Sequence, residues 1–318
     1  MNPRLLFLVR RLLLAVPILL VMSVCVFLMV RLIPGDPVRS MLGLRATPEN
    51  VAVIRAQMGL DRPLVEQYLE WISGVLRGDL GQDYISHTPL SELLGQRLPV
   101  TLELTLFGVL VALLIGIPLG VVAAVGPRWA RVLTDVLVVA GVSIPAFWLG
   151  IMLVLLFTGA LRVLPPAGFT PLFDDPVANL RYMVLPALTL AAAQGAYILR
   201  TTKASMLDVL ESPFILFLRA KGISEGRIRF RHALRNAAVP IVTVIGIQFG
   251  ALLGGAVVIE TLFALPGVGS LIVTAINLRN YPVVQGGVLV IATLFILVNL
   301  ATDLLYGVLD PRTAAGGS

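Results

Sequence analysis

The 318-residue chain is 58% hydrophobic and only 13% charged, with a mean hydropathy of +0.94. Charged residues have about half the share that is usual in a globular domain. This composition excludes a soluble fold, because a soluble fold of this size cannot bury so much apolar surface. The net charge of +6 does not indicate a nucleic acid partner, since the basic residues cluster beside apolar runs and so follow membrane topology. We therefore predict an all-α integral membrane protein embedded in a lipid bilayer.

Six uncharged runs are long enough to cross a bilayer, which takes about 20 apolar residues. They are residues 12–30, 104–125, 136–161, 182–199, 236–259 and 280–302. The first run is too long for the apolar core of a signal peptide, and no small-residue cleavage motif follows it, so we interpret it as an uncleaved helix. A seventh run, 261–278, contains Leu-Pro-Gly-Val-Gly-Ser, which breaks helices. We predict a loop or a partly re-entrant segment there.

Residues 32–98 form the one long polar segment, which we predict to be an extracytoplasmic loop with short helices. Thr47 is suited to cap a helix that starts at Pro48, and Gly59 is suited to close it. A second helix over 63–77 would have one apolar face. That face comprises Leu64, Tyr68, Trp71, Ile72, Val75 and Leu76. It either packs on another part of the loop or lies on the membrane surface.

The distribution of basic residues favours six spans with both termini inside the cell. Under that topology most Lys and Arg residues fall in inner segments, including Arg312 near the C-terminus. The short outer loops hold only Arg162, Arg181 and Arg279. The long loop also contains basic residues, but loops longer than about 60 residues largely escape the positive-inside rule.

The most basic stretch, 211–240, lies between the fourth and fifth predicted spans. Ser212 and Pro213 are typical of a helix start and Gly222 of a helix stop, so we predict a short helix over 213–221. Ser224 is suited to cap the next helix, with Glu225 in its first turn. A short apolar helix outside the membrane has two explanations that remain open. It either lies on the lipid surface or fits a groove on a soluble partner.

Seven segments together resemble the dipeptide/oligopeptide/nickel family of ABC-transporter permeases, specifically the permease type with the long first loop. They occur in the family's order and cover nearly the whole chain. They are RLIPGDP (31–37), MGLDRPLVEQYLEWISGVLRGDLG (58–81), PVTLELT (99–105), SIPAFWLG (143–150), RAKGISEGRIRFRHALRNAAVP (219–240), GGAVVIETLFALPGVGSL (254–271) and NYPVVQG (280–286). One departure is that Phe214 to Phe217 are apolar where family members often have polar residues, and the family's Glu-Ala-Ala is absent.

The resemblance implies a type I ABC importer permease fold in the bacterial inner membrane. It implies a second homologous permease subunit, two ATP-binding subunits and an extracytoplasmic peptide-binding protein as partners. The expected divisions are 1–31 (cytoplasmic N-terminus and first span), 32–98 (outer loop) and 99–318 (permease core, with a cytoplasmic coupling loop at 205–236). The residues implied in docking to the ATPase are Phe214, Phe217, Leu218, Arg219, Ala220, Lys221 and Gly222.

The sequence contains no recognisable catalytic constellation, so we expect no catalytic residue, metal site or cofactor. There is no Gly-x-x-x-x-Gly-Lys-Ser/Thr phosphate loop, so ATP hydrolysis is expected in partner subunits. Cys25 is the only cysteine, which rules out a cysteine metal cluster. His87 and His232 fall on opposite sides of the membrane. Gly267-Val268-Gly269-Ser270 superficially resembles a serine nucleophile, but no histidine lies in a neighbouring span.

Polar residues within the spans are candidates for the translocation path. Gln194, Tyr197, Gln248 and Asn299 either form interhelical hydrogen bonds or face a water-filled path. Glu260, expected at headgroup level beside the Gly/Pro-rich turn, is the candidate for a gate or for contact with a substrate amine. A stripe of small residues predicts close helix packing, with the subunit interface as one location. The stripe is Gly246, Gly250 and Gly254.

Two other functional classes compete with the ABC permease. A secondary transporter or channel would act without ATP, but such carriers often have ionisable residues in mid-span, and the spans here have none. A membrane enzyme is the third hypothesis, and no catalytic motif supports it.

Overall fold

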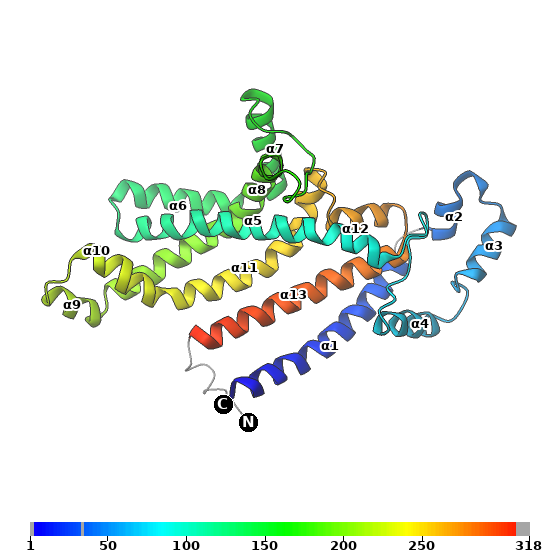
Figure 1. Ribbon diagram of the computed structural model, residues 1–318, viewed down its shortest axis with the longest axis horizontal. Coiled ribbons are helices and arrows are strands. Elements are labelled where there is room, and N and C mark those ends of the chain that lie inside the picture. The colour runs from blue at the N-terminus through cyan, green and yellow to red at the C-terminus, as the bar shows by residue number, and fades with distance from the viewer. Residues whose placement is uncertain (1–2, 33–34, 310–318) are drawn as a thin grey trace.

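The computed structural model describes residues 3–32 and 35–309, and the side chains of residues 13–32 and 35–302. Five helices in this part of the chain are long and apolar enough to cross a membrane. Figure 1 shows them running lengthwise beside one another. They are α1 (Pro3–Leu32), α5 (Leu90–Val125), α8 (Pro176–Leu210), α11 (Leu234–Leu262) and α13 (Tyr281–Leu309).

The third predicted span, 136–161, is not one straight helix. The chain forms α6 (Arg128–Ser143), then α7 (Ala146–Val154) and the π-helical turn η2 (Leu155–Ala160), with a bend of 107° between the two parts. Pro145 explains the break, because a proline pushes the residue before it out of the helical region, and Ile144 has φ −80° and ψ 123°. Six spans result if this bent pair counts as one.

Helices α5 and α8 form the most closely packed pair, and small residues on α5 make this possible. A Cβ atom at Gly116 would lie 2.8 Å from the carbonyl oxygen of Gly195. At Gly120 it would lie 2.5 Å from the Cβ of Thr202. Glycine at these positions lets the two helix backbones approach closely, as is common between membrane helices.

The short helices lie at the two ends of the molecule, except for α7 and η2, which project from its side (Figure 1). One end, called the α9 end, holds α9 (Pro213–Ala220), α10 (Glu225–Arg227), η3 (Ile228–Ala233) and the α5–α6 connection. The other, called the α12 end, holds α2 (Pro37–Leu42), η1 (Gly43–Arg45), α3 (Pro48–Gln57), α4 (Leu64–Leu76) and α12 (Val268–Asn277).

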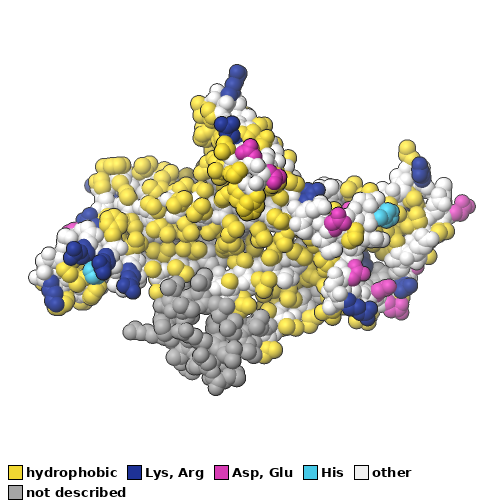
Figure 2. Space-filling view, viewed as in Figure 1, with side chains coloured by type: hydrophobic (Ala, Val, Ile, Leu, Met, Phe, Trp, Pro, Cys, Tyr) yellow, Lys and Arg dark blue, Asp and Glu magenta, His cyan; other side chains and the backbone are white. Residues whose placement is uncertain are grey.

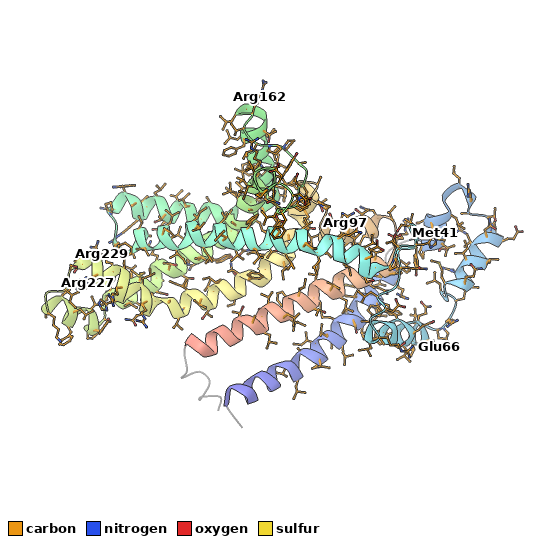
Figure 3. The ribbon with its side chains drawn as sticks, viewed as in Figure 1. Met41, Glu66, Arg97, Arg162, Arg227 and Arg229 are labelled. Atoms are coloured by element: carbon orange, nitrogen blue, oxygen red, sulfur yellow. The ribbon has the colours of Figure 1, made fainter. Side chains whose placement is uncertain are left out.

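The two ends of the molecule differ in charge. Figure 2 shows basic side chains gathered over the α9 end, whereas the α12 end carries acidic and basic side chains together. In Figure 3, Arg227 and Arg229 lie at the α9 end, whereas Met41 and Glu66 lie at the opposite one. Arg312, part of the same prediction, lies outside the described residues.

Two helices of the long loop form as predicted, but the second packs elsewhere than expected. The hydroxyl of Thr47 accepts from the Asn50 N–H at 3.3 Å, and Gly59 closes α3 with φ +65°. Helix α4 packs on the first span rather than on the loop. Tyr68 shares a 2.9 Å hydrogen bond with Ser23, and its ring meets the edge of Phe27.

The uncharged run 261–278 breaks where the sequence predicts, but most of it is helical. Helix α11 continues to Leu262, and α12 begins at Val268 after the Pro-Gly turn. Because α12 has 10 residues, it is about 15 Å long and too short to span a bilayer.

Candidate functional site

Helix α9 is held against the bundle by one face and leaves the other uncovered. Ile215 is fully buried and Leu218 is 7% exposed, in a cluster with residues of α5, α8 and α11. Phe214, Leu216 and Phe217 are all exposed on the remaining surface. An exposed row of large apolar side chains on a firmly anchored helix is suited to docking.

The ends of α9 lie as predicted, although the capping differs. Pro213 occupies the first turn, and Gly222 closes the helix with φ +75°, a conformation that favours glycine. The hydroxyl of Ser212, however, donates to the carbonyl of Val209 at 2.6 Å, so it does not cap α9. Ser224 stands at the start of α10 without a side-chain capping bond. Both capping predictions are therefore wrong. The Ser212 hydroxyl bonds to the preceding helix, and the Ser224 hydroxyl makes no capping bond.

Charged residues tie α9 to the helix that follows. Arg219 donates to Glu225 at 2.7 Å, and Glu225 also pairs with Arg229 at 3.7 Å. Lys221 lies over the ring of Phe217, with its Nζ atom 4.5 Å from the centroid. Glu225 therefore joins the two helices across the Gly222 turn, a role beyond the predicted interaction with a helix dipole.

Of the residues predicted to dock the ATPase, the structure separates Leu218 from the rest. Its side chain points into the bundle and anchors α9. The exposed ones are Phe214, Phe217, Arg219, Ala220, Lys221 and Gly222. The helical periodicity predicts that Leu218 lies on the same face as Ile215, because the two residues are three positions apart.

Two of the polar residues in the spans bond to each other across the bundle. The amide of Gln248 on α11 donates to the side-chain oxygen of Gln194 on α8. Tyr197 lies one turn from Gln194 and is 42% exposed. Asn299 donates to the carbonyl of Phe295 in its own helix at 3.0 Å. The interhelical interpretation is thus confirmed for the glutamine pair, while the bond of Asn299 stays within α13.

Glu260, expected at headgroup level, is enclosed by other parts of the protein. Its side chain is 0% exposed. The hydroxyl of Thr101 on α5 donates to it at 2.6 Å, and the Ser270 N–H donates to its other oxygen at 2.9 Å. Thr101 also accepts from the Val268 N–H at 2.9 Å. The carboxylate therefore caps the N-terminus of α12, where a negative charge is favourable.

The two glycines after Pro266 make room for this carboxylate. A Cβ atom at Gly267 would lie 2.2 Å from the Cδ atom of Glu260, and one at Gly269 would lie 2.5 Å from the Cα of Val257. Sequence reasoning found the Pro-Gly turn but missed Thr101, because no local pattern links it to a residue 159 positions away.

The glycine stripe on α11 packs within the chain. A Cβ atom at Gly246 would overlap Thr302, and one at Gly250 would lie 2.6 Å from Phe295, both on α13. Nothing lies within 4 Å of such an atom at Gly254. Close packing is confirmed for the first two positions, but their partner is α13 of the same chain and not a second subunit.

The two histidines lie far apart in the structure. His87 belongs to the segment between α4 and α5, at the α12 end, and His232 belongs to η3, at the α9 end. Among the described residues, no group of three His, Cys, Asp or Glu side chains is placed to hold a metal ion.

Comparison with known proteins identifies the family. Residues 116–315 match the model of the binding-protein-dependent transport system inner membrane component, and residues 4–105 match the N-terminal model of such membrane components. A putative peptide transport system permease protein of Brucella suis biovar 1 is 42% identical over 299 residues, 94% of this chain and 95% of that protein. The chain belongs to the binding-protein-dependent transport permease family.

Other relatives place this permease among the dipeptide and oligopeptide ABC permeases. The glutathione transport system permease protein GsiC of Salmonella typhimurium is 42% identical over 306 residues, 96% of this chain and 97% of that protein. The dipeptide transport system permease protein DppB of Alkalihalophilus pseudofirmus is 38% identical over 324 residues, 95% and 97% of the two chains.

A solved structure supports the fold of the permease. The MetNI methionine ABC transporter, in an inward-facing conformation, matches with a TM-score of 0.53 and 19% identity, over 69% of this chain and 97% of that one. The permease is thus a multi-pass inner-membrane transport subunit with a type I ABC permease fold. Family membership decides against a secondary transporter or channel.

Proposed function

We propose that the permease forms a translocation path with a second homologous permease subunit, and that two ATP-binding subunits drive it. The proposed substrates are dipeptides, oligopeptides or similar small solutes, delivered by an extracytoplasmic binding protein. Under this proposal residues 32–98 and α12 face the outside, and residues 205–236 and both termini face the cytoplasm. ATP hydrolysis belongs to the partner subunits, because the sequence has no phosphate-binding loop of its own.

The observation that carries the proposal is the apolar row on α9. Phe214, Leu216 and Phe217 are exposed, while Ile215 and Leu218 fix the opposite face of the helix. Burying one such side chain contributes about 1.5–3 kcal/mol, so covering three favours a partner with a complementary groove. Because α9 is anchored and closed by Gly222, a partner that moves it also moves α8, to which it is directly joined.

For the path itself we propose Tyr197, Gln194 and Gln248. Tyr197 is exposed, Gln194 lies one turn before it on α8, and Gln248 reaches Gln194 from α11; both glutamines are only partly buried. Each glutamine amide can release the other glutamine and bond to a peptide group of the substrate instead. No polar atom is then left unpaired. Glu260 is not part of this proposal, because its oxygens are occupied at the start of α12.

The test replaces Phe217 by Asp and Gly222 by Val in the complete transporter. We expect normal membrane insertion, loss of co-purifying ATPase subunits, and loss of ATP-dependent uptake of radiolabelled alanyl-alanine and glutathione into proteoliposomes. The control is Phe173→Asp, an exposed phenylalanine (96%) in the loop after η2, which should change neither property. If both α9 variants keep the ATPase and the uptake, α9 lies on lipid and the docking assignment is wrong. If the unaltered transporter takes up neither these two compounds nor a set of longer peptides, the substrate assignment is wrong.

A further inference from the structure

We propose that α12 relays movement of the docking helix α9 to the outer loop, and that Thr101 and Glu260 are the positioning residues that fasten α12 to α5. The proposal rests on the proposed function, because it takes α9 as the element that the ATPase moves. It assigns a role to a buried carboxylate that the docking site and the proposed path do not use.

The relay begins where α5 meets α9. Val121 and Ala124, near one end of α5, belong to the same buried cluster as Ile215 and Leu218 of α9. The cluster also contains Met206 of α8. A displacement of α9 therefore acts on α5 through this shared cluster, because well-packed side chains have little room to absorb it.

Helix α5 can transmit that displacement over its whole length. It is continuous from Leu90 to Val125, and the close contacts of Gly116 and Gly120 with α8 brace it on one side. Thr101 lies 20 positions before Val121, which corresponds to about 30 Å along the helix. One continuous helix, with Pro118 inside it, thus connects the α9 cluster with the start of α12.

The junction at Thr101 is built to remain closed. Its hydroxyl joins the Glu260 carboxylate to the Val268 N–H, and the Ser270 N–H occupies the other carboxylate oxygen. Opening the junction would take the Thr101 donor from a buried carboxyl group and leave the buried Val268 N–H without its acceptor, which is unfavourable. We infer that α12 moves together with α5 during transport, and that the junction does not act as a gate that separates.

The far end of α12 carries the outer loop. Directly after it, Arg279 donates to the Ser40 hydroxyl in α2 at 2.8 Å. The next residue, Asn280, accepts from the Tyr84 N–H at 3.3 Å. A shift of α12 therefore displaces two separate parts of the loop, which is the surface that a binding protein outside the membrane would meet.

The first experiment uses the complete transporter in proteoliposomes and compares three threonine variants. Thr101→Val removes the hydroxyl at nearly constant volume, Thr101→Ser keeps a hydroxyl, and Thr105→Val is the matched control. Thr105 is equally buried one turn further along α5, but its hydroxyl bonds only to the Thr101 carbonyl of its own helix. The readout is ATP hydrolysis with and without the binding protein loaded with alanyl-alanine.

For Thr101→Val we expect unchanged basal hydrolysis and about a tenfold loss of stimulation by the binding protein, because one bond to a buried charge is lost. Thr101→Ser and Thr105→Val should keep the stimulation. Normal stimulation in Thr101→Val would overturn the relay while leaving the docking of α9 untouched. Loss of basal hydrolysis in Phe217→Asp, in contrast, bears on the docking alone.

A disulfide between α5 and α12 tests the relay even if Thr101→Val fails to assemble. With Cys25 replaced by Ser, the pair Thr101→Cys and Val268→Cys can form a disulfide. The 2.9 Å bond between these residues places their Cα atoms within about 7 Å, near the upper limit for such a link. We expect full stimulation and uptake in the oxidised protein, and about a tenfold loss of stimulation after reduction. Blocked uptake in the oxidised protein would show that the junction must open, and would overturn the proposal.

Discussion

The hydroxyl of Thr101 lies 2.6 Å from the carboxylate of Glu260, although 159 positions separate the two residues in the chain. Both side chains are shielded from solvent, at 1% and 0% exposure. No Lys or Arg among the described residues forms an ion pair with Glu260. Hydrogen-bond donors from α5 and α12 satisfy its carboxyl group instead.

Replacing Gly267 by Ala should destabilise the permease. The backbone at this position has φ −96°, which any residue adopts, so the effect is steric: the new methyl group would lie 2.2 Å from the Cδ atom of Glu260. We expect a loss of about 1–3 kcal/mol, as for other overpacked sites. Thermal unfolding of the purified protein measures it. Gly226→Ala is the control, since its methyl group would meet nothing within 4 Å; equal melting temperatures for both variants would contradict the prediction.

The glycines of α11 should differ in their tolerance of a methyl group. Gly246→Ala would place a Cβ atom on Thr302 and should lower the melting temperature clearly, whereas Gly254→Ala meets nothing within the chain and should not. If Gly254→Ala is stable but no longer associates with the second permease subunit, that position contacts a partner. Equal destabilisation by both substitutions would show that the packing of α11 on α13 is assigned wrongly.

The Gln194–Gln248 bond should be measurable by a double-mutant cycle. Leucine at either position removes one partner, and the coupling energy between the substitutions should be about 0.6 kcal/mol, with an upper value near 1.7 kcal/mol. Denaturation in mixed micelles provides the four free energies of unfolding. Asn299 serves as the control, because its amide bonds to its own helix and should show no coupling to Gln194. A zero coupling for the glutamine pair would refute the bond.

Tyr84 should make the outer loop sensitive to alkali. Burial raises the pKa of its phenol to about 12, an effect that the charge of Arg31 only partly offsets. In the unfolded chain the phenol ionises at about pH 10, so stability is constant below that pH and falls as the pH rises toward 12. The full loss is about 2.7 kcal/mol. Tyr84→Phe should lose less stability than the parent protein between pH 10 and 12, and identical losses would contradict a raised pKa for the partly buried Tyr84 phenol.

The sequence alone was sufficient for the features that depend on local composition. Long apolar runs give the membrane helices, Pro213 and Gly222 mark the ends of α9, and Pro266 with Gly267 ends α11. The ordered motifs also lead to the family, which the comparisons confirm. These signals are readable because hydropathy and backbone propensity are properties of neighbouring residues.

The sequence did not predict the surroundings of residues that depend on distant partners. Glu260 was expected at headgroup level because it ends an apolar run, and the family resemblance implied Leu218 in docking. Only the tertiary structure brings Thr101 of α5 to Glu260 and turns Leu218 into the bundle. The physical reason is that helix packing, and not sequence proximity, decides which polar groups meet and which apolar faces remain uncovered.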